Sequence, residues 1–424
     1  MKCFFVLLAV GCLVTAVNAQ WLETTIQLDS ASNPRALCYN PQNNKVYCAN
    51  AGCDNVTVID GATNGVIATV AADSAPFALG YNPTNNKVYC ANYGGANVTI
   101  IDGATDSVIA AVAADKYPYA LCYNLTDNKV YCANQGSGNV TVINGATDSV
   151  ITTVSAGFSP WTLCYNPTDN KVYCANQRSD DVTVIDGATD SVVATVAAGD
   201  EPCALSYSPT DNKVYGANRY GGSVTVIDCE TNGVIGTVAA GNTPRALCYN
   251  PTDNKVYCAN EGSDNVTVID GATDSVIATV VAGDRPEALC HDPINNKVYC
   301  ANFSGGNVTV IDGASNGVIA TIGVGIWPVD FVHNPTRNRT YVANWGGSSI
   351  SVLRDSMSGI EESFKPQAPN RELEATVIRC LPAGAVAFDA MGRRVANPRS
   401  GIFFVREAQA QAQAQAVRKI VVTR

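Results

Sequence analysis

The sequence has few of the side chains on which enzymes most often rely. Its 424 residues include only two histidines, His291 and His333. Two histidines nearly exclude a histidine-rich metal site or a chain of histidine proton relays. The sequence contains no P-loop, zinc-type pair of Cys-x-x-Cys motifs, serine nucleophile elbow or dinucleotide-binding fingerprint. We therefore expect neither a bound metal nor a cofactor.

Basic residues and long apolar runs are also scarce. Lys and Arg number 27 against 37 Asp and Glu, which gives a net charge of -10. A surface that binds nucleic acid needs excess positive charge to release counterions from phosphates, so no nucleic-acid partner is expected. After the first segment no run reaches the ~18 apolar residues of a membrane-spanning helix, so we expect no transmembrane segment.

The first segment, MKCFFVLLAVGCLVTAVNA (1–19), has the pattern of a signal peptide. One lysine precedes an apolar run, and the small residues Val17 and Ala19 precede a cleavage point after Ala19. This pattern predicts an exported protein that is secreted or held at the cell surface. A lipoprotein cut before Cys12 is the alternative, but it would have an unusually short signal.

A segment of 42 residues recurs eight times without insertion or deletion, as the tyrosines from Tyr47 to Tyr341 and the prolines from Pro34 to Pro328 show. A fixed period of this length indicates a repeat architecture. Each copy holds four short runs such as ALCY, KVYCA, VTVID and VIATV, rich in Val, Ile, Tyr and Thr and separated by Asn, Asp, Gly and Pro. No helical periodicity is present. Four strands in one repeat predict a blade of a β-propeller.

The two ends of the array predict a closed ring. The segment TTIQL (24–28) precedes the first proline and aligns with the fourth strand of a repeat, whereas only three strands follow Pro328. The N-terminal strand can therefore complete the last blade, which removes the exposed sheet edges of an open array. We predict an all-β fold with an eight-bladed propeller at residues 20–355, in which the first strand of each repeat lines the central channel.

The repeat P-x-A-L-x-Y-N-P-x-x-N-K-V-Y-x-A-N, followed by VTVIDGAT, resembles the YVTN-type β-propeller repeat of secreted and surface-layer proteins. The resemblance covers residues 21–355 and holds eight times in phase. It implies the propeller fold and a location outside the cell. Members of that family commonly have seven blades, so the eight copies here depart from the usual number.

A second resemblance lies beyond the linker SMSGIEESFKPQAPN (356–370). The segment that follows contains FDAMGRRV, SGIFFVR and a terminal VRKIVVTR, and it resembles the C-terminal sorting domain of bacterial type IX secretion substrates. The resemblance implies a small β-sandwich at residues 371–424 that engages the secretion machinery. The alternating run AQAQAQAQA (408–416) is unusual for such domains, and an unspecialised β-domain is the alternative.

Differences between the copies predict which face of the propeller binds a ligand. The turns NPTDNK and DGATDS are almost constant, and both lie on one face, which we call the turn face. The loops before each proline and after each YCAN motif lie on the opposite face, the loop face, and differ between copies. Apart from framework tyrosines and Phe331, every aromatic residue between Pro34 and Arg354 falls on the loop face: Phe77, Tyr93, Tyr117, Tyr119, Phe158, Trp161, Tyr220, Phe303, Trp327 and Trp345.

The loop aromatics predict a binding surface. Aromatic side chains provide large, stiff contact areas with polar tips, which suit sugars and protein partners. We therefore predict a secreted or cell-surface binding module, not an enzyme, with a glycan or protein ligand. Packing between loops, or drift after duplication, is the alternative origin of the pattern. The predicted contacts are Phe77, Tyr119, Trp161, Trp327 and Trp345 as apolar anchors, with Arg35, Arg245 and Glu287 for polar orientation.

Two other functions remain open from the sequence. His291 and His333 replace a framework tyrosine in consecutive copies, and Glu287 and Asp330 stand near them in the repeat. Carboxylates beside histidines near a channel are suited to acid/base chemistry, so a hydrolase or lyase is one alternative. A histidine in place of a buried tyrosine is, however, usually a packing change. A structural surface-coat protein is the other alternative.

Ten cysteines recur as couples in the first and second strands of five copies. If the turn is centred so that neighbouring tyrosines pair, the members of each couple lie opposite each other, with Cα atoms about 4.5 to 5.5 Å apart, within reach of a disulfide. Export favours oxidation, whereas packing as small apolar residues is the alternative. The candidate disulfides join Cys38 to Cys48, Cys122 to Cys132, Cys164 to Cys174, Cys248 to Cys258, and Cys290 to Cys300.

Overall fold

A computed structural model describes residues 20–355 continuously and five strands within residues 376–422. The predicted signal peptide and the linker at 356–370 lie outside the described residues. The chain divides into two compact units, Met1–Glu361 and Glu362–Arg424. In the part of the chain that the structure describes, no helix has the length and apolar character needed to cross a membrane.

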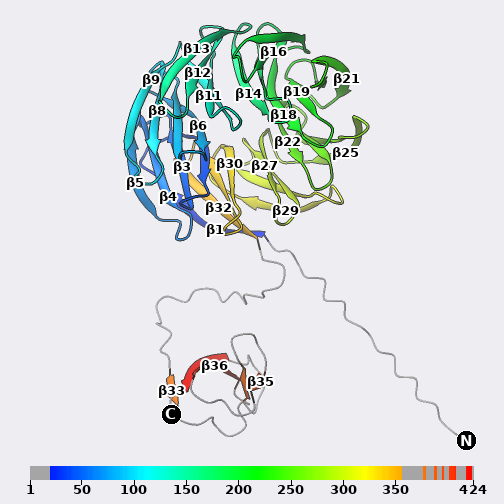
Figure 1. Cartoon of the computed structure of the whole chain (residues 1–424). Coiled ribbons are helices and arrows are strands. Elements are labelled where there is room, and N and C mark those ends of the chain that lie inside the picture. The colour runs from blue at the N-terminus through cyan, green and yellow to red at the C-terminus, as the bar shows by residue number, and fades with distance from the viewer. Residues whose placement is uncertain are drawn as a thin grey trace, which may run out of the picture. The chain divides into compact units, whose positions relative to one another are not determined.

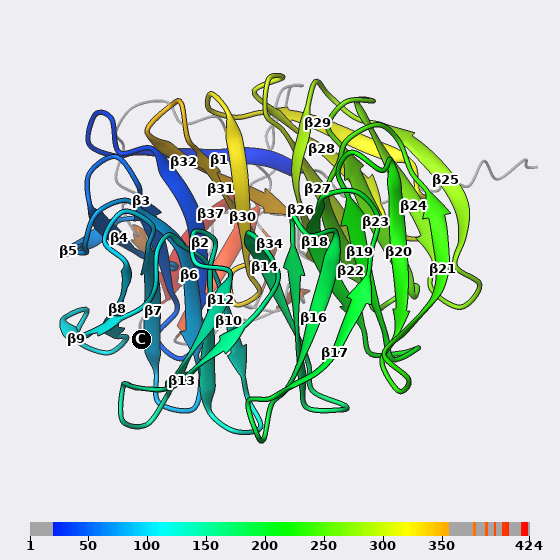
Figure 2. The same cartoon turned by 90° about the horizontal axis from the view of Figure 1, so that it is seen from above.

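The first unit is a ring of eight four-stranded antiparallel sheets (Figures 1 and 2). Innermost strands of successive blades contact one another around the ring, and β2 contacts β30 where it closes. The eight-bladed propeller is thus confirmed. Blades 1 to 4 contain β2 (Pro34–Asn40), β3 (Lys45–Asn50), β4 (Asn55–Asp60), β5 (Val66–Ala71); β6 (Pro76–Asn82), β7 (Lys87–Asn92), β8 (Asn97–Asp102), β9 (Val108–Ala113); β10 (Pro118–Asn124), β11 (Lys129–Asn134), β12 (Asn139–Asn144), β13 (Ser149–Ser155); and β14 (Pro160–Asn166), β15 (Lys171–Asn176), β16 (Asp181–Asp186), β17 (Val192–Ala197). Blades 5 to 8 contain β18 (Pro202–Ser208), β19 (Lys213–Asn218), β20 (Ser223–Asp228), β21 (Gly233–Ala239); β22 (Pro244–Asn250), β23 (Lys255–Asn260), β24 (Asn265–Asp270), β25 (Ser275–Val281); β26 (Pro286–Asp292), β27 (Lys297–Asn302), β28 (Asn307–Asp312), β29 (Val318–Gly323); and β30 (Pro328–Asn334), β31 (Arg339–Asn344), β32 (Ser349–Asp355), β1 (Gln20–Gln27).

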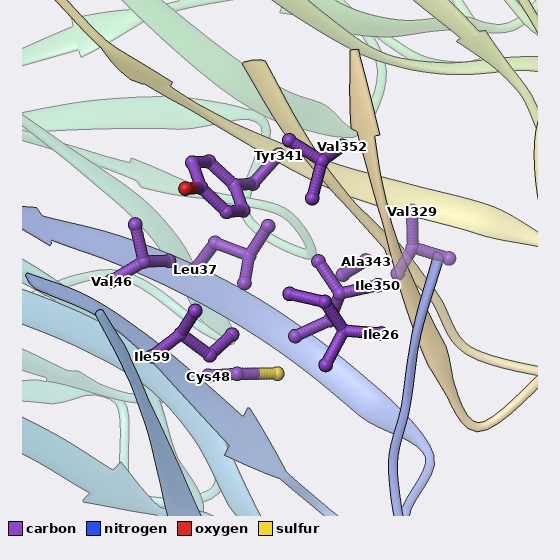
Figure 3. Close-up of a cluster of buried hydrophobic side chains, with 10 residues drawn as sticks. All are labelled: Ile26, Leu37, Val46, Cys48, Ile59, Val329, Tyr341, Ala343, Ile350 and Val352. Atoms are coloured by element: carbon purple, nitrogen blue, oxygen red, sulfur yellow. The ribbon is translucent and has the colours of Figure 1, made fainter. Parts of the chain in front are cut away.

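The N-terminal strand closes the ring, as predicted. β1 lies beside β32 and pairs antiparallel with it (Figure 1). Ile26 of β1 lies opposite Ile350. Ile26 also belongs to a buried cluster that contains Leu37 and Val46 of blade 1 (Figure 3). The first strand of the described chain therefore holds the last blade against the first.

The constant turns of the turn face join neighbouring blades. Lys129 Nζ lies 2.9 Å from Asp190 Oδ2 in the next blade, and the hydroxyl of Tyr131 donates to Asp190 Oδ1 at 2.6 Å. We call this Lys–Tyr–Asp contact the latch. It recurs at Lys45 with Asp106, Lys87 with Asp148 and Lys213 with Asp274, while Asn232 and Asn316 accept the bonds of Lys171 and Lys255.

The asparagine that ends each NPTDN-type turn has a conformational role as well. Asn44 and Asn86 have φ angles of 51° and 56°, in the left-handed region that asparagine tolerates better than most residues. Asn86 Oδ1 also accepts a hydrogen bond from Asn40 Nδ2 of the preceding blade at 2.8 Å. The near-constancy of the turn face thus follows from turn geometry and blade-to-blade contacts.

The register of the inner hairpins contradicts the geometry assumed for the disulfides. Cys122 lies opposite Tyr131, and Cys132 lies opposite Leu121. Because adjacent residues of a strand point to opposite faces, Cys122 packs between blades 3 and 4 and Cys132 between blades 2 and 3.

The same shift separates every candidate couple: Cys38 from Cys48, Cys164 from Cys174, Cys248 from Cys258, and Cys290 from Cys300. All ten are free thiols in this structure. Burial raises the pKa of Cys132 to about 12, so this thiol is held in its protonated, unreactive form.

The described part of the second unit is one five-stranded sheet. Its strands are β33 (Thr376–Ile378), β34 (Val386–Phe388), β35 (Arg394–Val395), β36 (Gly401–Arg406) and β37 (Val417–Val422). They lie in the order β33-β37-β36-β34-β35, and β36 and β37 pair antiparallel. The segments SGIFFVR and VRKIVVTR therefore supply paired strands, while the AQAQAQAQA run lies outside the described residues.

Candidate binding site on the loop face

A β-bulge near the start of each inner strand positions one variable side chain. In blade 3, Pro118 pairs with Asn134 and Ala120 pairs with Ala133, so Tyr119 between them has no partner. A bulge of this kind bends the strand and redirects the side chain of the extra residue. The eight bulged residues line one cavity of about 350 Å³ at the channel mouth, which we call the mouth: Arg35, Phe77, Tyr119, Trp161, Cys203, Arg245, Glu287 and Val329.

One half of the mouth is an aromatic arc. The ring of Tyr119 lies 4.5 Å from that of Phe77 and 4.2 Å from that of Trp161, measured between centroids. The guanidinium of Arg35 lies 4.5 Å from the centroid of Phe77, and that of Arg245 lies 5.8 Å from the centroid of Trp161. Cation–π contacts of this kind fix the orientation of both arginines at the two ends of the arc.

The other half of the mouth is charged. Arg245 donates from Nε and Nη2 to Glu287 Oε1, at 3.0 and 2.8 Å. Burial alone would raise the pKa of Glu287, but the adjacent Arg245 outweighs this effect and holds the pKa below its usual value. Glu287 is therefore ionised at neutral pH and orients Arg245.

A second ring of variable residues lies outside the first. Each of its members follows a YCAN-type motif, and several line a cavity of about 310 Å³ that shares Arg35, Phe77 and Glu287 with the mouth. Here Glu261 bridges Arg219, at 3.3 Å, and Arg285. The members that line this cavity are Ala51, Arg219, Glu261, Phe303 and Trp345.

Most of the predicted ligand contacts meet at these two cavities. Trp345 lines the second cavity, and six others line the mouth: Arg35, Phe77, Tyr119, Trp161, Arg245 and Glu287. Trp327 is the exception, because it stacks on Phe303 with a centroid distance of 5.5 Å and lines neither cavity. The sequence prediction omitted Arg219, Arg285 and Phe303 from the contacts, although their place before the proline or after the YCAN motif marks them as variable loop-face residues.

The four candidate catalytic residues do not converge. Glu287 and Asp330 line the mouth, whereas His291 and His333 lie four and three residues farther along β26 and β30 and line neither cavity. His333 instead lies with Nε2 3.4 Å from Oδ1 of Asp292, a residue that the sequence did not single out. Desolvation lowers the pKa of both histidines, so both are neutral at neutral pH. Within the described residues no group of three or more His, Cys, Asp or Glu side chains could hold a metal ion.

Asp330 is the other carboxyl group of the mouth, and its pKa is raised. Its Oδ2 accepts a hydrogen bond from the backbone N–H of Leu37, across the ring closure, at 2.7 Å. Desolvation raises its pKa from 3.8 to about 6, although this hydrogen bond and Arg35 act in the opposite direction. Asp330 therefore titrates close to neutral pH.

The raised pKa of Asp330 predicts a pH-dependent stability. Folding favours the protonated form of Asp330. Its contribution to the free energy of unfolding is therefore fully present below pH 3.8 and is lost as the pH rises through about 6. Because the carboxyl group faces an open cavity, we expect a loss on the order of 2 kcal/mol relative to Asp330→Asn between pH 4 and 7. Denaturant titrations of both proteins at several pH values measure this difference. A constant difference over that range would contradict the prediction.

The fold and the site together define a β-propeller with a ring of variable residues around its channel mouth. The model of the YNCE-like beta-propeller family matches residues 166–397, more than half of the chain. The protein belongs to this family. A search of curated proteins found no match.

A solved structure with a similar fold is Kuenenia stuttgartiensis hydrazine synthase. The match has a TM-score of 0.57 and 18% sequence identity, and it covers 79% of this chain and 99% of that chain. At this identity the similarity shows the propeller fold alone, because one fold hosts many unrelated functions.

Proposed function

We propose that this protein is a non-catalytic binding module that holds a glycan or protein ligand on the loop face. The observation that carries the proposal is the ring of eight bulged residues, in which an aromatic arc faces the Arg245–Glu287 ion pair around one cavity. Concave sites with apolar walls and a few oriented polar groups are typical of ligand binding. The turn face, by contrast, is nearly constant because its latches join neighbouring blades, so its constancy does not indicate a ligand.

We further propose that the module acts outside the cell. The signal-peptide pattern at residues 1–19 supports export, and the resemblance of residues 371–424 to a type IX sorting domain supports engagement of a secretion machinery. The five-stranded sheet described in the second unit is compatible with such a domain. Export would bring the propeller to a location where surface glycans and proteins are available as ligands.

The proposal is tested by probing glycan and protein arrays with the full-length exported protein and with a variant that combines Trp161→Ala, Trp327→Ala and Trp345→Ala. Because tryptophans that a ligand covers are frequent hot spots worth about 2 kcal/mol or more, we expect the variant to bind at least roughly 30-fold more weakly. Tyr220→Ala is the matched control, since Tyr220 is an exposed loop-face aromatic that lines neither cavity. Equal binding by the triple variant and the control would overturn the aromatic-face proposal.

A further inference from the structure

A larger groove lies on the same face, between the loops of blades 2 to 4. It has a volume of about 550 Å³, and we call it the outer groove. Tyr117 and Phe158 line it with 48% and 76% of their surface exposed, which are large fractions for aromatic side chains. Gln135, Ser159 and Arg178 add polar groups to its walls.

The backbone holds the aromatic walls of the outer groove in place. Tyr117 has a φ of 59°, and the residue before the proline has a positive φ in every copy, so the backbone of the repeat fixes the direction of this side chain. Its ring lies over Gly136, where a Cβ atom would come within 2.4 Å of Tyr117 Cδ2. The backbone N–H of Phe158 donates to Ser179 Oγ at 2.9 Å, and its carbonyl accepts from the N–H of Arg178 at 3.1 Å. The groove is therefore a built feature of these loops.

Aromatic rings run without a break from the mouth to the outer groove. Tyr93 stacks on Tyr117 with centroids 4.7 Å apart and an interplanar angle of 17°. The same Tyr93 ring lies 5.5 Å from Phe77 and 6.2 Å from Tyr119, both of which line the mouth. Tyr93 thus connects the aromatic arc of one cavity with the aromatic wall of the other.

Arg35 and Arg178 stand at the two ends of this path. Arg35 lies near enough to Glu287 and Asp330 to lower the pKa of both, but it forms an ion pair with neither. Among the described residues, no carboxylate forms an ion pair with Arg35 in the mouth or with Arg178 in the outer groove, whereas Arg219, Arg245 and Arg285 are all paired. Guanidinium groups that hold no carboxylate in an ion pair are available to the anionic groups of a ligand.

We propose that the mouth and the outer groove are the two ends of one track that binds a linear acidic glycan, a chain of uronic-acid residues. Sugar rings stack on the path from Phe77 to Tyr117, and carboxylates pair with Arg35 and Arg178. Hydroxyl groups bond to polar groups such as Gln135. This proposal rests on the proposed function and adds the ligand class and its extended form.

The test measures binding of galacturonic-acid oligomers of increasing length to the full-length exported protein by calorimetry, with neutral galactose oligomers of equal length beside them. We expect affinity for the acidic series to rise at least tenfold from the shortest oligomer to the length that spans both cavities, and to fall with added salt. The neutral series should bind more weakly at every length.

A variant of the outer groove separates the two ends of the track. It combines Tyr117→Ala, Phe158→Ser and Arg178→Gly. Other copies of the repeat already have these residue types at the equivalent positions, namely Ala75, Ser74 and Gly136, so we expect the backbone to accept them. We expect it to lose the gain with length and to keep the affinity for short oligomers. Arg35→Ala with Trp161→Ala should weaken binding at every length.

The outcomes distinguish this inference from the proposed function. Affinity that does not depend on length, with the mouth variant still defective, overturns the track and leaves the mouth as a binding site. Failure of every acidic oligomer to bind overturns the ligand class, and a protein ligand found on the arrays would then replace it. Loss of length dependence in the outer-groove variant alone supports the track.

Discussion

Ile26→Asp is expected to lower the free energy of unfolding of the propeller by roughly 4 kcal/mol or more. Ile26 is only 9% exposed, and it packs among Leu37, Val46, Ile350 and Val352 at the closure of the ring. An aspartate there would bury a carboxylate without a cationic partner and would weaken the pairing of β1 with β32. The opened ring would then expose the edge of β32 to solvent and to other chains.

The neighbouring residue provides the control for Ile26→Asp. Gln27 is exposed on the opposite side of β1, so Gln27→Asp adds the same charge to the same strand without entering the core. We expect it to change the free energy of unfolding by less than about 0.5 kcal/mol. Denaturant-induced unfolding followed by circular dichroism measures both variants. Similar midpoints for the two would show that β1 does not hold the ring closed.

Asp355→Ala is expected to cost about 3 to 5 kcal/mol, because it leaves a buried charge without a partner. The side chains of Lys297 and Asp355 are each 1% exposed, and Lys297 Nζ lies 2.9 Å from Asp355 Oδ1. The hydroxyl of Tyr299 donates to Asp355 Oδ2 at 2.6 Å. Blade 8 has no DGATDS turn, so Asp355 at the end of β32 supplies the carboxylate that the turn supplies elsewhere.

The repeated latches supply the controls for Asp355→Ala. Between blades 1 and 2, Lys45 and Asp106 make the same contact with side chains that are 12% and 13% exposed. Water can reach this lysine, so Asp106→Ala should cost only about 1 to 2 kcal/mol. Asp355→Asn should also cost less than Asp355→Ala, since an asparagine accepts the lysine bond in two other latches. Equal losses for Asp106→Ala and Asp355→Ala would contradict the role given to burial.

The period of the sequence was sufficient to predict the propeller, its blade number and its closure. The register between the first two strands of each blade was predicted wrongly. The disulfide hypothesis assumed that Tyr39 pairs with Tyr47. The structure pairs Tyr39 with Val46 and Asn40 with Lys45, because Asn44 in the left-handed conformation closes the turn one residue earlier. A shift of one residue moves a side chain to the other face of the sheet, which is why both cysteines of each couple face different blades.

The candidate site shows a similar division. The bulged residues were found from the sequence because each occupies one fixed position of the repeat, directly after the proline. The Arg219–Glu261 ion pair joins residues that are 42 positions apart on neighbouring blades. Such contacts depend on how adjacent loops lean toward each other, and a periodic pattern carries no information on that angle. The stacking of Trp327 on Phe303, outside both cavities, could not be foreseen for the same reason.

The latches also bear on how the gene can change its number of repeats. Joins between the interior blades use the same lysine and tyrosine with an aspartate or asparagine of the turn, so recombination between copies would add or remove a blade without creating a mismatched junction. The seam differs, because Lys297 meets Asp355 and Arg339 meets Glu23 of β1. Gain or loss of a repeat would therefore be accommodated in the interior of the array, where it would alter the circumference of the mouth and leave the closing blade unchanged.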